Sequence, residues 1–351
     1  MIQGQSKTEA NYRAIQTDSS SSLKEFSMDR KKYHKKYVLG EKVEDKENQA
    51  ATIGRLVETL LLEPEQFDNR FYMSSCSSTP TGLMLDFVEA LYRVTKEATD
   101  AFGVVTRTFD ELTRDAYVES GFKIKIEQVI SKFVGTDAEV YYNEIRKVRS
   151  QNLTVINSND VTNADKIVTE LRNNIVTRDL VNLVSNTRYT VLNQYQIESY
   201  VVDGHTFKSM FDKLIIDHDA QTVQVYDLKC TWSVENFYDE YYLYRRAYIQ
   251  AYLYYRATVH LVTDPKSKWF GYSAKHPAFI VCDSTNYYNP LIYTLTEEDI
   301  NDCYVGFDHK SRRYAGVKEL IEDLDWALYN GVWNISRTNF ENAGIVNIKG
   351  K

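Results

Sequence analysis

The stretch that most constrains the fold is residues 189–231, which are rich in Val, Ile, Tyr, Phe and Thr and are divided by turn signals. This composition favours β-strands, and the Asp203-Gly204 pair is typical of a tight hairpin turn. A second, weaker turn signal lies at residues 218–221. We therefore expect three antiparallel strands between about 189 and 231.

Helical patterns lie on both sides of these strands. Residues 51–63 place apolar side chains on one broad stripe, and Pro64 ends that pattern. Residues 83–150 have the pattern of a run of long helices, and 160–186 are similar. After the strands, the sequence predicts a long helix at about 235–258, a strand near 277–283, and helices around 297–303 and 316–330.

Composition excludes several classes of protein. Hydrophobic residues make up 43% and charged residues 26%, as in average soluble globular chains. No window approaches the ~18 apolar residues of a membrane span, and residues 1–16 lack the apolar stretch of a secretory signal. The cysteines Cys76, Cys230, Cys282 and Cys303 are widely spaced, which suggests neither a disulfide scaffold nor a zinc or iron–sulfur site. A reducing, cytosolic setting fits best.

The charge balance limits how this chain could bind a polyanion. Lys and Arg number 42 against 49 Asp and Glu, a net charge of −7, which excludes a uniformly basic coat but allows a local basic groove. Residues 19–37 contain a basic cluster, either a solvated helix face or an entry lip for a polyanion. Its members are Arg30, Lys31, Lys32, Lys35 and Lys36.

Two carboxylates and a lysine stand out within the predicted strands. A period of two places Asp227 and Lys229 on the same face of one strand. If the hairpin turns about Asp219 and Ala220, then Asp212, seven residues before Asp219, lies opposite Asp227, seven after Ala220. In that register the carboxylates are cross-strand neighbours, with Cβ atoms roughly 4.5–5.5 Å apart.

Two like charges placed so close together would destabilise the hairpin unless something compensates them. Mg²⁺ would relieve the repulsion, since it prefers few carboxylates together with waters and phosphate oxygens. It also polarises a phosphate and acidifies a water, and Lys229 could then hold that water or stabilise developing charge. An Asp-x-Lys pattern alone also occurs in ordinary surface hairpins.

Two flanking helices offer further polar groups. On the helix predicted at 235–258, Arg246, Gln250 and Tyr254 are spaced i, i+4, i+8 and should share one face. That face could cover the site and contact a phosphate backbone, or it could simply be solvated. The helix at 51–63 adds Glu58 as a candidate third carboxylate, although most glutamates so placed are solvated.

The order of these residues resembles a known superfamily. Asp212, then Asp227-x-Lys229, then Gln250-x-x-x-Tyr254 resembles the PD-(D/E)xK nucleases, in the RecE-like, RecB-like and lambda-exonuclease-like branch. Three further segments are similar to RecE-type exonucleases: Ser-Ser-Leu-Lys at 21–24, the helix from Gly54 to Phe67, and the region of Leu324-Asp325-Trp326 and Trp333.

Two positions depart from the pattern of that superfamily. Glu58 stands where RecE-like and RecB-like members usually carry His, although lambda-type exonucleases use a carboxylate in the equivalent helix. Phe211 stands where the name of the motif has Pro, a position that varies within the superfamily.

The resemblance implies an α/β fold with a restriction-endonuclease-like core, in which helices flank a central mixed sheet. The core would form a single domain over 1–351, with a helical insertion at 83–186 and a β-rich catalytic core at 187–285. The implied activity is that of a Mg²⁺-dependent exodeoxyribonuclease, with Mn²⁺ as a substitute, acting 5′→3′ on linear duplex DNA ends in phage-type recombination.

The resemblance also implies partners and a location. The partners would be duplex DNA ends, a single-strand annealing protein and further copies in a ring, with no membrane. The location would be the cytoplasm, that of the host if the chain is phage-encoded.

The resemblance also assigns roles to residues. Asp212, Asp227 and the Leu228 carbonyl would bind metal, with Glu58 as a further carboxylate. Lys229 would position the attacking water, and Gln250 and Tyr254 would organise the site and the DNA strand. The candidate DNA-binding residues are Arg245, Arg246, Arg30, Lys31 and Lys35.

Two other classes of function remain open. One is a non-catalytic DNA-binding or assembly protein on the same fold, although such members often lose an acid or the lysine, and all are present here. The other is a Cas4-like or RecB-like nuclease of different polarity, which often carries an iron–sulfur cysteine cluster or a fused helicase.

Overall fold

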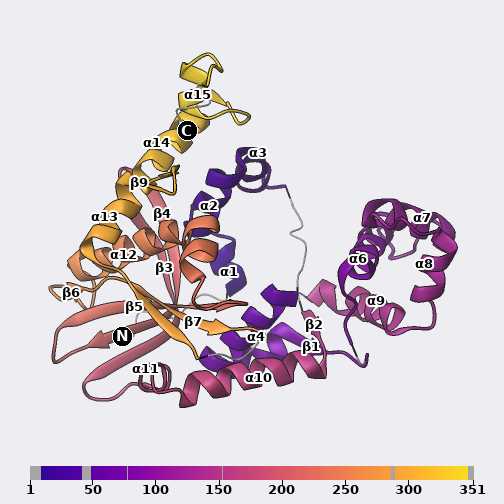
Figure 1. The fold of residues 1–351 in the computed structure, drawn as a ribbon, viewed down its shortest axis with the longest axis horizontal. Helices are drawn as coiled ribbons and strands as arrows, with labels where there is room; N and C mark the ends of the chain where they lie inside the picture. The colour runs from indigo at the N-terminus through magenta and orange to yellow at the C-terminus, as the bar shows by residue number, and fades with distance from the viewer. Residues whose placement is uncertain (1–8, 42–48, 77, 152, 286–288, 347–351) are drawn as a thin grey trace. The chain divides into compact units, whose positions relative to one another are not determined.

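The protein was analysed as a computed structural model that describes residues 9–41, 49–76, 78–151, 153–285 and 289–346. The chain divides into two compact units, residues 1–47 with 169–351 and residues 48–168 (Figure 1). The second unit starts and ends earlier than the helical insertion predicted at 83–186. One reason is that β1 (Phe71–Met73) pairs in parallel with β2 (Thr154–Ile156) and so joins both ends of this unit.

The first unit is built on a mixed six-stranded sheet. The strand order is β3-β4-β5-β7-β8, and β6 pairs with β5. Strand β5 runs parallel to β6 and β7, while the other pairs are antiparallel. The three strands predicted between 189 and 231 and the strand near 277–283 are confirmed. The strands are β3 (Tyr189–Val202), β4 (His205–Asp217), β5 (Thr222–Thr231), β6 (Ser273–Ala274), β7 (Ala278–Asp283) and β8 (Leu291–Thr294).

Helices flank this sheet, so the unit has a mixed α/β fold. Helix α12 packs against the sheet, where Ile249 and Leu253 share a core with Leu214 and Val225 (Figure 1). The helices are α1 (Glu9–Arg13), α2 (Ser20–Met28), α3 (Arg30–Tyr33), α11 (Arg178–Val181), α12 (Ala247–Thr263), α13 (Glu297–Val305), α14 (Val317–Asn330) and α15 (Arg337–Glu341). A short hairpin, β9 (Gly306–His309) and β10 (Arg312–Ala315), separates α13 from α14.

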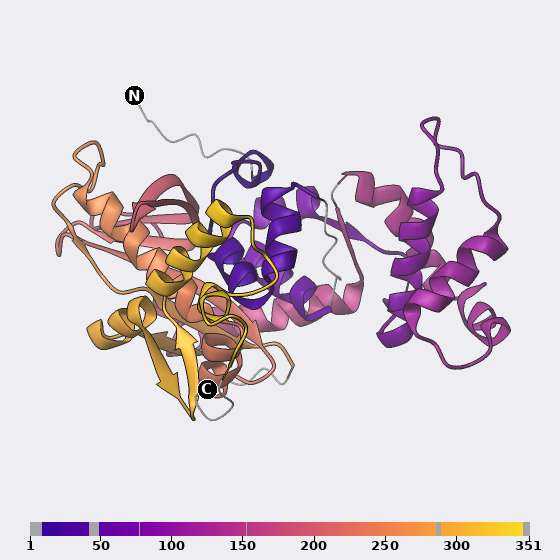
Figure 2. The same ribbon diagram turned by 90° about the horizontal axis from the view of Figure 1, so that it is seen from above.

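The second unit is mostly helical and has its own core. Helices α6 to α9 pack together around Phe87, Leu91, Phe133 and Ile145, each fully buried (Figure 2). The predicted run of long helices is therefore confirmed, as is the end of α4 before Pro64. The helices are α4 (Gln49–Leu62), α5 (Phe67–Arg70), α6 (Gly82–Glu97), α7 (Phe109–Ser120), α8 (Ile126–Phe133) and α9 (Asp137–Val148). Helix α10 (Ser158–Asn173) crosses the boundary at residue 168.

The helix predicted at 235–258 is interrupted. A π-helical turn covers Tyr238–Tyr244, and α12 begins only at Ala247. Arg246 lies directly before α12 with left-handed φ and ψ of 56° and 41°, which costs about 1–3 kcal/mol for a residue other than glycine. The prediction that Arg246 shares a helix face with Gln250 and Tyr254 is therefore wrong. Aromatic residues keep helical spacing both before and after this interruption, so the periodicity of the sequence did not reveal the interruption.

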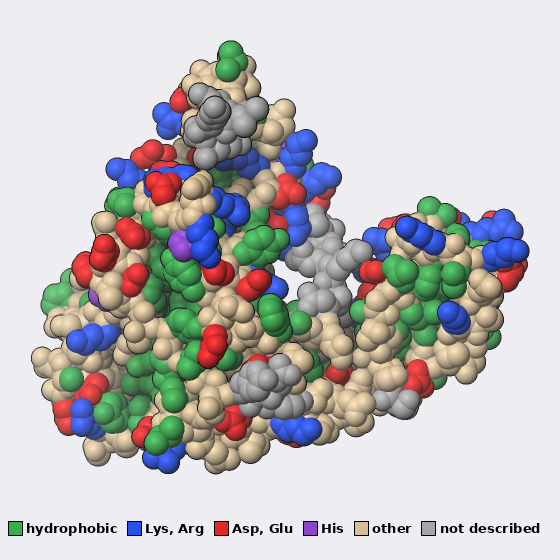
Figure 3. Space-filling view, viewed as in Figure 1, with side chains coloured by type: hydrophobic (Ala, Val, Ile, Leu, Met, Phe, Trp, Pro, Cys, Tyr) green, Lys and Arg blue, Asp and Glu red, His purple; other side chains and the backbone are tan. Residues whose placement is uncertain are grey.

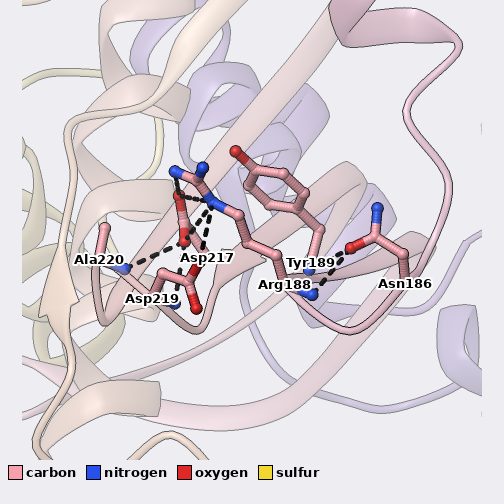
Figure 4. A network of polar contacts seen from close by, with 6 residues as sticks. All are labelled: Asn186, Arg188, Tyr189, Asp217, Asp219 and Ala220. Atoms are coloured by element: carbon pink, nitrogen blue, oxygen red, sulfur yellow. Dashed lines mark hydrogen bonds and ion pairs between the residues drawn. The ribbon is translucent and has the colours of Figure 1, made fainter.

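The turn between β4 and β5 is held by polar contacts of Asp217 and Arg188 (Figure 4). Asp217 Oδ1 accepts the backbone N–H groups of Asp219 and Ala220, each at 3.0 Å. Its Oδ2 pairs with Arg188 Nη2 at 2.8 Å. These contacts hold the position of the turn, and with it the register that runs from Asp217↔Thr222 to Lys213↔Tyr226. This register is the one predicted from the sequence.

Asp217→Asn should destabilise the protein in a pH-dependent way. Hydrogen bonding to Arg188, followed by the Ala220 amide, lowers the pKa of Asp217 from 3.8 to about 2. A carboxyl with a lowered pKa stabilises the fold above its unfolded pKa, and that contribution is lost as the pH falls through the folded value. Urea denaturation should therefore show a constant stability gap between wild type and variant at neutral pH, which narrows between about pH 4 and pH 2.

A matched control is Arg178→Ala, which removes a charge from an exposed pair with the neighbouring Asp179. It should change stability little, because exposed ion pairs contribute little. A gap between wild type and Asp217→Asn that stays the same at every pH would show that the Asp217 charge does not hold the turn.

Candidate active site

The end of the β4–β5 ladder brings the two predicted carboxylates together. The register pairs Lys213 with Tyr226, so the next positions outward are Asp212 and Asp227. At this end of the ladder a side chain takes the place of a backbone acceptor: the Leu228 N–H donates to Asp212 Oδ2 at 2.8 Å. Strand β5 continues its pairing on its other edge, where Asp227 is the partner of Phe279 in β7. Both carboxylates thus occupy the same end of one hairpin.

Asp227 is 1% exposed, and the two oxygens of its carboxylate have different surroundings. Oδ1 accepts a hydrogen bond from Gln250 Nε2 at 2.7 Å. Oδ2 forms an ion pair with Lys229 Nζ, but it accepts no hydrogen bond of good geometry from any residue that the structure describes. A buried carboxylate oxygen is costly to leave unpaired, and here the Lys229 ammonium compensates it. An oxygen of this kind is suited to a hard divalent cation.

Gln250 and Tyr254 extend this network along α12. Gln250 Nε2 also donates to Tyr254 OH at 2.9 Å, and Tyr254 OH donates to the Met210 carbonyl at 2.7 Å. Burial, then the charges of Asp227 and Asp212, raise the pKa of Tyr254 well above its usual 10. Tyr254 therefore stays neutral, and its hydroxyl fixes Gln250 by accepting from Nε2, so that Gln250 in turn orients Asp227.

A residue to which the sequence assigned no role, Lys24, also reaches the site. It lies half-buried on α2, and its Nζ donates to Gln250 Oε1 at 3.3 Å. Burial, then the Lys229 ammonium, lower the pKa of Lys24 to about 8, while the Asp227 charge opposes that shift. Two lysines thus lie near one buried carboxylate. Lys24 belongs to the Ser-Ser-Leu-Lys segment of the resemblance, but it is 226 residues from Gln250, so no spacing rule could pair the two.

Helix α2 is held against the sheet by contacts at its N-terminal end. Ser19 caps the helix, with reciprocal side-chain bonds between Ser19 and Ser22. The Asp18 carbonyl accepts the Lys208 N–H of β4 at 2.8 Å, and the Asp18 carboxylate lies 2.9 Å from His205 Nε2. These contacts dock the helix that carries Lys24 against β4.

The predicted cationic residues have different surroundings. Arg245 is exposed and lies over the Tyr241 ring at 4.4 Å, and Arg246 Nη1 donates to the Ser27 carbonyl. Arg30 pairs with Asp323, with Nη1 to Oδ1 at 2.9 Å. Basic and acidic side chains lie side by side in the region of α3 and α14 (Figure 3). Lys31 and Lys35 are exposed to solvent.

Glu58 lies half-buried on α4, in the second unit. Its role as a further carboxylate of the site stays a prediction. Among the described residues, no group of three or more His, Cys, Asp and Glu side chains could hold a metal ion. The first unit offers the carboxylates of Asp212 and Asp227 and nearby backbone carbonyls. These hard oxygen donors, with Asp227 Oδ2 among them, fit Mg²⁺.

Comparisons with known proteins give little further information. No family model matches the sequence, and no curated protein matches it. Among solved structures, the chain is similar to a protein from Eubacterium rectale that is provisionally described as an exonuclease. The two are 11% identical with a TM-score of 0.47, over 98% of this chain and 89% of the other. This similarity does not establish a family.

In the part of the chain that the structure describes, no helix is both long enough and apolar enough to span a membrane.

Tyr254→Phe should lower the free energy of unfolding by about 1–3 kcal/mol, because it removes the hydroxyl that accepts from the buried Gln250 side chain and donates to the Met210 carbonyl. Tyr254 is 6% exposed, and Met210 O would lose the hydrogen bond from its hydroxyl. Urea denaturation at neutral pH measures the change. Tyr329→Phe is the control, since Tyr329 is 90% exposed and should be neutral. Equal stability of the two variants would show that the Tyr254 hydroxyl does not support the network.

Proposed function

We propose that this protein is a Mg²⁺-dependent deoxyribonuclease of the PD-(D/E)xK type. The observation that carries the proposal is the buried Asp227 carboxylate, whose Oδ2 pairs with Lys229 and accepts no further hydrogen bond from the described residues. Asp212 occupies the facing position of the same hairpin. Two carboxylates beside a lysine supply a divalent-cation site and a positive group for an attacking water, which phosphodiester hydrolysis requires.

Each residue of the site then has a part in the reaction. Asp212, Asp227 and the Leu228 carbonyl are the groups of the first unit that would hold Mg²⁺. When bound, Mg²⁺ polarises the phosphate and lowers the pKa of a water. Gln250 holds Asp227 through Oδ1, which leaves Oδ2 to the cation, and Tyr254 holds Gln250 in turn.

The chemical step is a hydrolysis. Lys229 holds the attacking water, whose oxygen forms a bond to phosphorus as the bond from phosphorus to the leaving sugar oxygen breaks. The leaving oxygen takes up a proton, so the products are a phosphate monoester and an alcohol.

The proposal extends to 5′→3′ digestion from the ends of linear duplex DNA, in phage-type recombination with a single-strand annealing protein. It is supported by the order of the motifs Asp212, Asp227-x-Lys229 and Gln250-x-x-x-Tyr254. Further copies arranged as a ring would keep the polymer bound between steps. Light scattering tests the ring, because a monomer that digests DNA distributively would contradict it and leave the nuclease proposal standing.

A digestion assay tests activity and polarity together. Linear duplexes labelled at the 5′ or the 3′ ends are incubated with Mg²⁺ beside a closed circular duplex. We expect release of label from one end only, with the circle intact. Cleavage of the circle would contradict the exonuclease assignment, and no cleavage of any substrate with Mg²⁺ or Mn²⁺ would contradict the nuclease.

Asp227→Asn should abolish most divalent-cation binding and most DNA cleavage while the protein stays folded. The substitution removes the charge that a cation would bind, and it also reduces repulsion between the facing carboxylates. Calorimetric titration with Mn²⁺ and a cleavage assay measure both effects. Asp219→Asn is the control, since Asp219 is exposed at the turn of the same hairpin. Full Mg²⁺-dependent cleavage by Asp227→Asn would refute the assignment of the site.

Lys229→Ala should leave cation binding nearly intact and slow cleavage by about 10²–10³-fold, a typical loss for one positioned electrostatic group. Lys275→Ala is the control. Lys275 is an exposed lysine near the start of β7, so this variant should cleave DNA at the wild-type rate. Single-turnover cleavage at saturating Mg²⁺ measures the rate. A variant that loses cation affinity but keeps its rate per bound cation would make Lys229 a structural residue.

A further inference from the structure

A pocket of about 580 Å³ lies next to the candidate active site. Four of its lining side chains are cationic, namely Lys24, Arg245, Arg246 and Arg312. The acidic residue that lines it is Glu25, which pairs with Lys32 at 2.9 Å and with Lys36 at 3.9 Å. Neither of these two lysines is one of the four cationic lining residues, so Glu25 does not neutralise any of the four. The pocket therefore concentrates positive charge in a chain whose net charge is −7.

Three separate segments supply these charges. Lys24 comes from α2, Arg245 and Arg246 directly precede α12, and Arg312 comes from β10. Arg245 and Arg312 lie over the rings of Tyr241 and Tyr314, at 4.4 and 5.2 Å. Aromatic rings hold a guanidinium without cancelling its charge. Both arginines therefore stay available to an anion.

Lys24 connects this pocket to the candidate active site. Its Nζ donates to Gln250 Oε1, and Gln250 Nε2 donates to Asp227 Oδ1. One lysine thus lines the pocket and also contacts the network around the buried carboxylate. An anion in the pocket would lie beside the groups proposed to cleave a phosphodiester.

We infer that this pocket binds phosphodiester groups of the DNA strand next to the bond to be cleaved, and that Arg312 is one of its binding residues. The inference rests on the proposed function for the identity of the polymer. Phosphate is favoured over a carboxylate ligand because the pocket adjoins a site that needs a phosphodiester, and the planar fork of arginine fits phosphate oxygens as well as it fits a carboxylate. Neither Lys24 nor Arg312 can be assigned to DNA from the spacing of the sequence motifs.

Binding measured without cleavage tests this inference. Fluorescence anisotropy of a labelled duplex in EDTA, over a range of NaCl concentrations, gives the affinity and its dependence on salt. Arg312→Ala should weaken binding several-fold and lower the slope of log K against log salt by about 0.9, as expected for one lost phosphate contact. Arg312→Lys keeps the charge and should keep the slope. Unlabelled polyglutamate of equal charge should compete poorly.

The matched control is Lys310→Ala, which removes one charge from the same β9–β10 hairpin. Lys310 pairs with Asp239 at 3.2 Å and is not among the residues lining the pocket, so its variant should bind like wild type. If Arg312→Ala does not fold, judged by circular dichroism, Arg245→Ala takes its place with the same expected change in slope.

The outcomes separate this inference from the proposed function. If the wild type cleaves DNA but Arg312→Ala binds with the affinity and slope of Lys310→Ala, the inference is wrong and the nuclease stands. If the wild type never cleaves but Arg312→Ala still weakens binding, the nuclease is wrong and the pocket stands. Polyglutamate competing as well as DNA would overturn the choice of a phosphodiester ligand.

Discussion

The pairing of β4 with β5 is the constraint on which the candidate site depends. A shift of one residue would turn Asp227 to the opposite face of the sheet and would expose Val223 and Val225, which are fully buried. The register is held from both ends of the ladder. Asp217 and Arg188 fix the turn, and Asp212 binds the Leu228 N–H at the far end. A carboxylate proposed for catalysis therefore also closes the strand pairing that positions it.

A buried charge explains the polar groups around that ladder. Asp227 is tolerated at 1% exposure because Gln250 donates to one of its oxygens and Lys229 pairs with the other. The same oxygen, Oδ2, is the one proposed for a divalent cation. A cation held there would lie beside the Lys229 ammonium, the group proposed to hold the attacking water. Burial, followed by repulsion from Lys229, lowers the pKa of Lys24, so the positive charges of the two lysines lie close together.

Local patterns made part of this arrangement predictable. The register followed from counting outward from Asp219 and Ala220, because a hairpin pairs residues at equal distances from its turn. Gln250 and Tyr254 followed from i, i+4 spacing and do contact each other. The position of Arg246 was not predictable in this way. Its left-handed backbone depends on tertiary contacts, such as its hydrogen bond to the Ser27 carbonyl, rather than on composition.

Contacts between distant segments were not predictable from spacing. Lys24 reaches Gln250 across 226 residues, and β10, which brings Arg312 to the pocket, is only a four-residue strand. The parallel pairing of β1 with β2 was missed for the same reason, since each has three residues and they lie far apart in the chain. Such short strands carry too few residues to show a period of two.

The basic residues of this acidic chain differ in whether they are available to a polyanion. Arg30 belongs to the basic N-terminal cluster, but its guanidinium pairs with Asp323, and both side chains are 17% exposed. Part of that cluster therefore serves the fold rather than a ligand. The cations that line the pocket are few, and each phosphate contact adds only a limited, salt-sensitive share of the affinity. Electrostatic attraction at this pocket could position a strand but would hold a long polymer only weakly through repeated steps. A processive enzyme built on this site would therefore need to enclose its substrate, and the proposed ring of subunits would meet that need.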